Sequence, residues 1–153
     1  MKKFAFLLFT CLISLSSFAQ YDNVIIKQVP QKFKINDKII LVNKSPYHIL
    51  QAVIALCKEN GDYLPLAAPA TSIASNQEVE YASFEYNRLK QLKGRNIAIK
   101  VKALKRPIEQ IDDLDSVNPE DITYNFDVTL SENRHDLIIT ISSKSASGNV
   151  MDF

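Results

Sequence analysis

Ser45 and His48 stand three positions apart at the start of a long apolar run, a spacing that could serve nucleophilic catalysis. A serine nucleophile needs a base within hydrogen-bonding reach and a third group that orients the base. The chain has no G-x-S-x-G motif, and its three glycines, at 61, 94 and 148, form no cluster for an oxyanion hole. We therefore interpret Ser45-Pro46 as a turn and His48 as the start of a β-strand.

Cys57 offers a second combination, because a thiol beside an imidazole is an activated nucleophile. If residues 47–57 form one strand, a rise of about 3.3 Å per residue places Cys57 roughly 30 Å from His48. A pair of Cys57 with His135 stays open, although a free cysteine in an apolar strand is typical of a small core residue. We predict that the protein is not an enzyme. A hydrolase of unrecognised type is the less favoured alternative, with Ser45, His48, Cys57 and His135 as its candidates.

The acidic segment 109–121 carries carboxylates at alternating positions, a pattern found in calcium-binding loops. It lacks the turn glycine of such loops and a terminal bidentate glutamate at the right distance. The few histidines and cysteines do not have the spacing of a zinc site either. We predict no metal and no cofactor, and a solvated acidic loop, with calcium binding as the alternative.

A run of basic residues gives the strongest charge pattern, with eight Lys and Arg and no acid between positions 88 and 106. One interpretation is a face that binds an anion or an acidic partner. The other is a solvated face whose lysines discourage edge pairing. Nucleic acid is not expected, because no aromatic residues interleave the bases as a stacking platform would need. The candidate basic face consists of Arg88, Lys90, Lys93, Lys100 and Lys102.

The first 19 residues have the layout of a secretory signal peptide. Lys2 and Lys3 precede the uncharged stretch 4–15, and Ser17-Phe18-Ala19 supplies small residues for cleavage before Gln20. A stretch of about twelve apolar residues is too short for a transmembrane anchor, which needs about 20. Cys11 lies inside the apolar stretch, where lipidation is not expected. We predict an exported protein, periplasmic or extracellular, with no membrane span in the mature chain.

The mature chain would comprise residues 20–153, which is 134 residues and enough for one domain with its own core. Loss of Lys2 and Lys3 leaves 16 of the 18 basic residues against 17 acidic ones, so no net charge directs it to nucleic acid or anionic membranes. Only Cys57 remains, so no intramolecular disulfide can form. We expect a single domain over 20–143 and a mobile Ser- and Gly-rich tail over 144–153.

The elements that would position these residues are mostly strands, identified by β-branched residues and a period of two. Asn60-Gly61 predicts a type I′ hairpin turn. Pro65 predicts an edge strand, because proline cannot donate to a ladder. In the expected strand 47–57, the even-numbered and the odd-numbered positions are both largely apolar. This predicts that the strand is buried on both faces, with a helix or loop over the second face. Residues 23–29 and 33–35 are short extended candidates. The expected strands are 38–43, 47–57, 62–67, 78–83, 95–104, 122–130 and 137–141, with one short helix over 84–93.

Seven or eight short strands separated by turns predict an all-β fold, a two-sheet β-sandwich. The order of elements, with a helical crossover before residue 95, resembles an immunoglobulin-like domain. The mature chain resembles small exported Ig-like domains of unknown function in three features: Asn43-x-Ser45, the long apolar strand and Ser75-Asn76-x-x-Val79. The signal, which ends in Phe-Ala-Gln, resembles those of exported proteins of Gram-negative bacteria. The Cys and Trp core of true immunoglobulin domains is missing. This resemblance implies a fold and no activity.

Export, an adequate core and the lack of a catalytic set favour a non-catalytic envelope module that binds a protein or a glycan. The alternative is a structural or assembly component that pairs with a partner through its strand edges. An exposed apolar edge strand and self-association would distinguish this alternative from the first reading.

Overall fold

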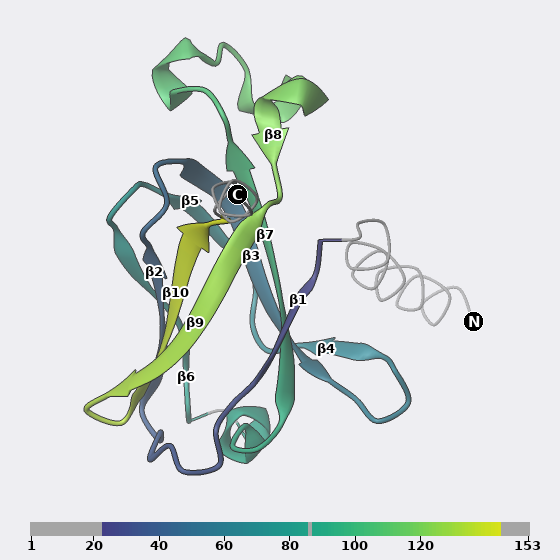
Figure 1. The fold of residues 1–153 in the computed structure, drawn as a ribbon, viewed down its shortest axis with the longest axis vertical. Coiled ribbons are helices and arrows are strands. Elements are labelled where there is room, and N and C mark those ends of the chain that lie inside the picture. The colour runs from purple at the N-terminus through teal and green to yellow at the C-terminus, as the bar shows by residue number, and fades with distance from the viewer. Residues whose placement is uncertain (1–22, 86, 145–153) are drawn as a thin grey trace, which may run out of the picture.

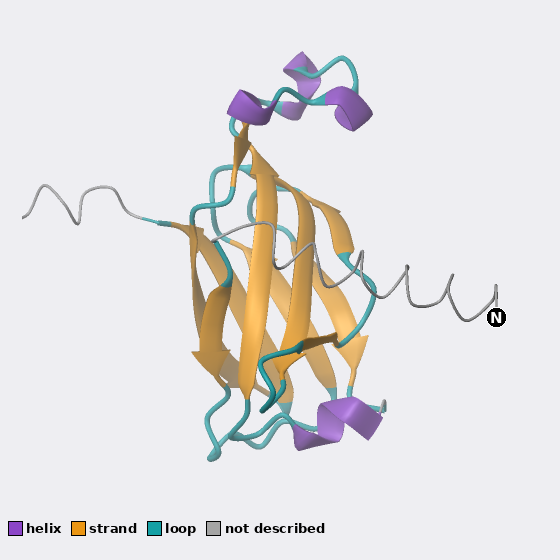
Figure 2. Ribbon diagram, turned by 90° about the vertical axis from the view of Figure 1, so that its right-hand side faces the viewer, coloured by secondary structure: helices purple, strands orange, loops and turns teal. Residues whose placement is uncertain are grey.

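The computed structural model describes residues 23–85 and 87–144, which form two β-sheets packed face to face (Figures 1 and 2). Sheet A has the order β1-β7-β3-β4, with β5 also paired to β3 and β8 to β7. Sheet B has the order β6-β2-β10-β9. The predicted two-sheet β-sandwich is confirmed at this level. The strands are β1 (Ile25–Gln28), β2 (Lys38–Asn43), β3 (His48–Cys57), β4 (Tyr63–Pro65), β5 (Ala70–Ile73), β6 (Glu78–Ser83), β7 (Asn96–Leu104), β8 (Ile122–Thr123), β9 (Phe126–Asn133) and β10 (Asp136–Ser143).

The centre of sheet A is the antiparallel pair β3 and β7, whose register runs from His48↔Leu104 to Leu56↔Ile97. Both strands are rich in Ile, Val and Ala, which suits them to burial on a pleated surface. The register shifts between Ile49 and Gln51. This irregularity lies near the end of β3 that carries His48.

The centre of sheet B is a parallel pair, β2 with β10, although β2 lies near the start of the described chain and β10 near its end. Ile39 is opposite Leu137 and Leu41 is opposite Ile139, and all four side chains are 0% exposed. A parallel pair needs a long connection, and here nearly the whole domain supplies it. Sheet B therefore joins the two ends of the domain through buried aliphatic contacts.

Tyr81 of β6 links the two sheets through its hydroxyl group. β5 pairs with residues 49–52 of β3 and β4 with residues 55–57. The N–H of Ile54 lies between these two segments and has no strand partner on that side. Ile54 N donates to Tyr81 Oη at 3.1 Å, and the hydroxyl lies 3.2 Å from Ile54 O and 3.0 Å from Ala67 O. The phenol therefore satisfies polar backbone groups that would otherwise be orphaned in the core.

The second face of β3 is covered mainly by side chains of its own sheet. Val53, Ala55 and Ala98 form a small buried cluster, against which Val24 and Tyr63 pack. The helical turn expected to cover this face lies instead at one end of the sandwich (Figure 2). Small residues on neighbouring strands are enough to exclude water from the backbone here.

Three expectations about secondary structure are wrong. The helix predicted over 84–93 is a five-residue 3₁₀ turn, η1 (Asn87–Gln91), because a segment this short has too few hydrogen bonds to sustain an α-helix. β5 lies inside 68–76, where no strand was expected. Its pairing with β3 is decided by tertiary contact rather than by local β-propensity. Residues 33–35, expected to be extended, belong to no strand.

The type I′ turn predicted at Asn60-Gly61 is not found there. In the Asn60-Gly61 turn only Gly61 has positive φ, at 90°, and Gly61 N bonds to Lys58 O. That geometry is a four-residue turn closed by glycine and not type I′. The two-residue turn with both φ values positive lies instead at Arg134 (51°) and His135 (73°), where β9 turns into β10. The predicted edge position of Pro65 is confirmed, since β4 ends sheet A.

Residues 1–22, 86 and 145–153 lie outside the described part of the chain. The predicted signal peptide and nearly all of the predicted tail fall on these residues. Within 23–85 and 87–144, no helix is long and apolar enough to cross a membrane.

Candidate functional site

Ser45 is part of a buried structural clamp and is not available as a nucleophile. Its hydroxyl lies 2.6 Å from Asn43 Oδ1, and its N–H donates to the same oxygen at 3.0 Å. The Nδ2 group of Asn43 donates to Tyr47 O at 2.9 Å and to Ile73 O at 3.0 Å. Asn43 is 0% exposed and Ser45 is 1% exposed. The Asn43-x-Ser45 pattern therefore holds the turn before β3 and ties it to β5.

His48 pairs with Ser72, a residue that sequence reasoning did not single out. Its Nε2 lies 3.0 Å from Ser72 Oγ, and Ser72 has a φ of 57°, in the left-handed region that non-glycine residues rarely adopt. Among the described residues, no carboxylate is hydrogen-bonded to His48, so nothing orients this base as in a catalytic triad. The pair is a polar feature of the surface at which β3 and β5 meet.

The connection between β7 and β8 forms a projecting arm, residues 105–121, made of three 3₁₀ turns (Figure 2). They are η2 (Ile108–Gln110), η3 (Leu114–Ser116) and η4 (Pro119–Asp121). At its base, Lys105 N donates to Asp121 O at 2.8 Å, and Arg106 Nη1 lies 3.2 Å from an Asp121 carboxylate oxygen. Arg106 Nη2 also donates to Gln110 O. The acidic segment predicted as a solvated loop is thus held at both ends.

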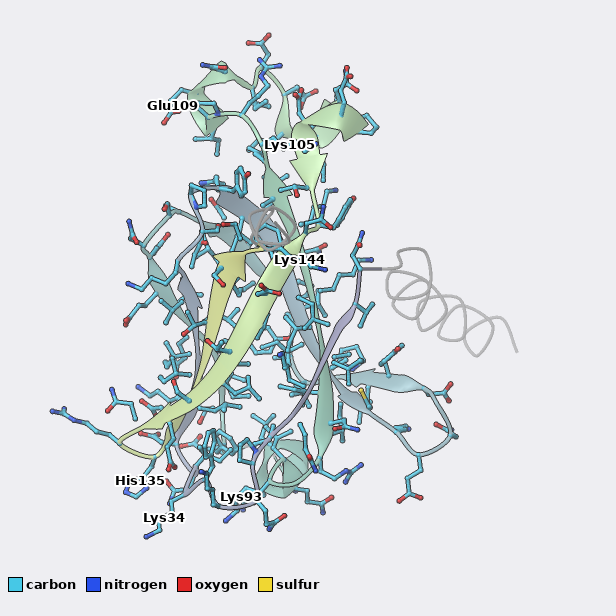
Figure 3. The ribbon with its side chains drawn as sticks, viewed as in Figure 1. Lys34, Lys93, Lys105, Glu109, His135 and Lys144 are labelled. Carbon is cyan, nitrogen blue, oxygen red and sulfur yellow. The ribbon has the colours of Figure 1, made fainter. Side chains whose placement is uncertain are left out.

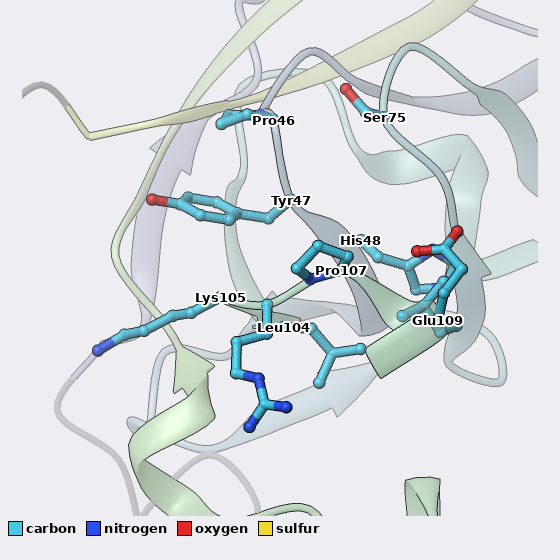
Figure 4. A pocket seen from close by; sticks show the side chains of 10 residues that line it. Pro46, Tyr47, His48, Ser75, Leu104, Lys105, Pro107 and Glu109 are labelled. Atoms are coloured by element: carbon cyan, nitrogen blue, oxygen red, sulfur yellow. The ribbon is translucent and has the colours of Figure 1, made fainter. Parts of the chain in front are cut away.

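The arm encloses three hollows with the edge of the sandwich. The first, of about 400 Å³, lies between Tyr47, His48 and the arm residues 105–109 (Figure 4). The other two, of about 320 and 360 Å³, share Leu50, Lys102 and Leu114, and we call them together the arm groove. The arm groove is lined by His48, Leu50, Gln51, Thr71, Ser72, Lys102, Leu114, Asp115, Val117, Pro119, Ile122 and Tyr124.

The lining of the arm groove mixes aliphatic surface with groups of both charges. Lys102 supplies an ammonium group and Asp115 a carboxylate, while Leu50 and Leu114 supply apolar contacts. Leu114 is 50% exposed. A concave surface with convergent polar groups and exposed apolar side chains is the usual form of a binding site.

Lys100 differs from its expected place on a wet face, because it is only 7% exposed. It lies opposite Val53 in the middle of sheet A, where neighbouring side chains shield it. Burial, and then the charge of nearby Lys102, lowers the pKa of Lys100 to about 8. Lys100 is therefore a shielded amine of the sheet rather than part of an open cationic surface.

The five residues of the predicted basic face do not form one surface patch. Lys90 lies on η1, and Lys93 lies beside that turn at the end of the sandwich away from the arm (Figure 3). β7 begins near η1 at Asn96, and Lys102 lies six residues further along the strand. At about 3.3 Å per residue, Lys102 is about 20 Å from Asn96. It lines the arm groove instead. Arg88 belongs to η1 by its backbone.

The other candidates for chemistry are also dispersed. His48 and Cys57 occupy opposite ends of β3, as the expected length of this strand required. Burial raises the pKa of the Cys57 thiol, which makes it less reactive. His135 lies in the β9–β10 turn, where its Nδ1 is 2.9 Å from Lys34 O. In the described ranges, no three His, Cys, Asp or Glu side chains lie close enough together to hold a metal ion.

No protein-family model, curated protein or solved structure matches this chain.

Sequence reasoning missed Leu114 and Ser72. A signal for Leu114 was present, because it is a leucine inside an otherwise acidic segment. Ser72 carried none, since its contact with His48 depends on the pairing of β5 with β3 over a distance of more than twenty residues.

Proposed function

We propose that this protein is an exported, non-catalytic, immunoglobulin-like module of the cell envelope that binds an extended segment of a partner protein in the arm groove. The signal-peptide pattern of residues 1–19 supports export. The use of Ser45 in a structural clamp and the separation of His48 from Cys57 support a role other than catalysis.

The exposure of Leu114 is the observation that carries this proposal. It is one of two large hydrophobic side chains that are exposed among the described residues, and it stands where both hollows of the groove meet. Exposed apolar surface at a concave site with polar groups marks a place where a partner docks.

The chemistry of the groove fits a polypeptide better than a glycan. An extended peptide presents apolar side chains together with backbone N–H and C=O groups that need partners. Leu50 and Leu114 match the first requirement, and Asp115 and Lys102 supply an acceptor and a donor for the second. A sugar ring would stack on aromatic side chains, and Tyr124 is the one Phe, Tyr or Trp among the lining residues.

A matched pair of substitutions tests the site. Ile26 on β1 is 47% exposed, nearly the same as Leu114, but does not line the groove. We expect Leu114→Asp to lose the proteins that the parent captures from envelope extract, while Ile26→Asp keeps them. Unchanged capture by Leu114→Asp would contradict the proposed site, and selective binding on a glycan array would assign the groove to a sugar.

The export part of the proposal has its own measurement. Cell fractionation of a producing Gram-negative strain should recover a chain that starts near Gln20 outside the cytoplasm. Recovery of an uncleaved chain in the cytoplasm would refute export without bearing on the groove.

A further inference from the structure

The strand β9 ends sheet B, and although β1 of sheet A passes within 8 Å of part of it, none of the described strands pairs with its outer edge. Its eight residues pair with β10 in an unbroken register from Phe126↔Ser143 to Asn133↔Asp136. It contains no proline, lysine or arginine, and its central residues 128–131 are uncharged. A long, regular edge of this kind is a template for pairing with another strand.

The other edges of the two sheets are each short or blocked. β1 has four residues and carries Lys27. β4 has three residues and ends at Pro65, and β5 is distorted by the positive φ of Ser72. β6 carries exposed Glu78 and Glu80, and its register with β2 is interrupted. Only β9 combines length, regularity and an uncharged centre among the strand edges that the structure describes.

The direction of the free backbone groups of β9 follows from the β9–β10 hairpin. Antiparallel pairs alternate between hydrogen-bonded and non-hydrogen-bonded residues. Lys144 N donates to Asn125 O, so Asn125 and Lys144 form a hydrogen-bonded pair. The backbone N–H and C=O groups of the odd-numbered residues of β9 therefore point towards β10. The N–H and C=O groups of Phe126, Val128, Leu130 and Glu132 therefore point away from the sheet. Between residues 23 and 144, Tyr86 aside, no backbone group pairs with them.

We infer that β9 pairs with β9 of a second copy of this chain, antiparallel about a two-fold axis at Thr129, and joins the two four-stranded sheets into one. This register pairs Val128 with Leu130 and Phe126 with Glu132 through the free backbone groups. On the exposed face, Thr129 meets Thr129 and Asp127 meets Ser131, so no like charges are opposed.

The sequence of β9 supports a second copy as the occupant. Side chains on its two faces alternate between buried and exposed from Phe126 to Thr129, and the two-fold axis keeps apolar residues on the inner face of both copies. The carboxylate of Glu132, which would face Phe126, already accepts from Lys34 N at 2.7 Å. A single strand pair buries less surface than the ~1,200–2,000 Å² of a stable interface. The dimer should therefore be weak and dissociate on dilution.

The first test is sedimentation velocity of the purified protein over a dilution series. We expect the mean mass to rise about twofold at high concentration, and Thr129→Lys to abolish this rise, because two ammonium groups would face each other on the axis. Thr140→Lys is the control, since Thr140 lies directly opposite Thr129 on β10 and away from the new edge. A protein that stays monomeric throughout, or a Thr129→Lys variant that still dimerises, would overturn the inference.

The second test reads the register by cysteine cross-linking in a Cys57→Ala background. Thr129→Cys should form a disulfide-linked dimer on oxidation, because Cα atoms of a non-hydrogen-bonded pair lie about 4.5 Å apart. Ser131→Cys should not, because the two-fold axis places its copies four residues apart along the strands, about 13 Å. Equal cross-linking of both variants, or of Ser131→Cys alone, would overturn the proposed register.

Discussion

Replacement of Asn43 by alanine should destabilise the domain more than any other change to a polar side chain. The Asn43 amide takes part in four hydrogen bonds, to the N–H and hydroxyl of Ser45 and to the carbonyls of Tyr47 and Ile73. The residue is 0% exposed, so water cannot replace these partners. The substitution removes the partner of a buried N–H and of two carbonyls, which belong to the turn before β3 and to β5.

The expected loss is about 3–5 kcal/mol in the free energy of unfolding. Each hydrogen bond contributes about 1 kcal/mol, and an orphaned buried group adds about 1–3 kcal/mol. A domain of this size is stable by about 5–15 kcal/mol, so the variant should fold but be much weakened.

Urea unfolding followed by circular dichroism measures this loss as a lower midpoint at unchanged slope. Asn60→Ala is the matched control, because Asn60 also makes two hydrogen bonds to Asp62 but in an exposed turn. We expect the control to cost at most about 1 kcal/mol. If Asn43→Ala cost no more than Asn60→Ala, the clamp would not be the element that holds the start of β3 to β5.

Three further predictions concern stability. The folded pKa of Lys100, about 8, lies below the ordinary lysine value of 10.5. The unfolded chain therefore binds more protons between these values, and stability should rise with pH across this window. Lys100→Met should remove most of that rise, as measured by urea midpoints at pH 7 and 10. A parallel pH dependence in the two proteins would contradict this. Tyr81→Phe should cost about 1–2 kcal/mol, because Ile54 N and Ala67 O lose their partner, and a thermal shift below one degree would show that these groups find another. Arg134→Gly should raise the melting temperature by lowering the strain of a positive φ, worth about 0.5–1 kcal/mol, while His135 keeps its contact with Lys34 O. An unchanged or lower melting temperature would count against a strained turn.

Local patterns in the sequence were enough to locate most strands. β2 and β6 have the predicted limits, 38–43 and 78–83, because β2 is rich in β-branched residues and β6 begins with alternating polar and apolar residues. The edge position of β4 followed from Pro65, which cannot donate to a ladder on both sides. These features depend on the chemistry of residues close together in the chain.

The sequence alone did not locate the groove or explain the role of Asn43. β5 lacks a strong strand pattern and forms because β3 offers it a partner, which also brings Ser72 to His48. The parallel pairing of β2 with β10 joins residues about one hundred positions apart, and no local signal encodes such a pair. The turn types were mispredicted because the register of the flanking strands, and not the Asn-Gly dipeptide alone, decides where a two-residue turn fits.

The sequence by itself determined that this chain forms strands around an aliphatic core, since composition and a period of two are local properties. Only the tertiary structure decided that Ser45 serves a buried clamp, that Lys100 is shielded and Lys102 lines a groove, and that β9 is left as an open edge. These outcomes depend on which strands become neighbours. Burial and hydrogen-bond satisfaction across the whole domain select those neighbours.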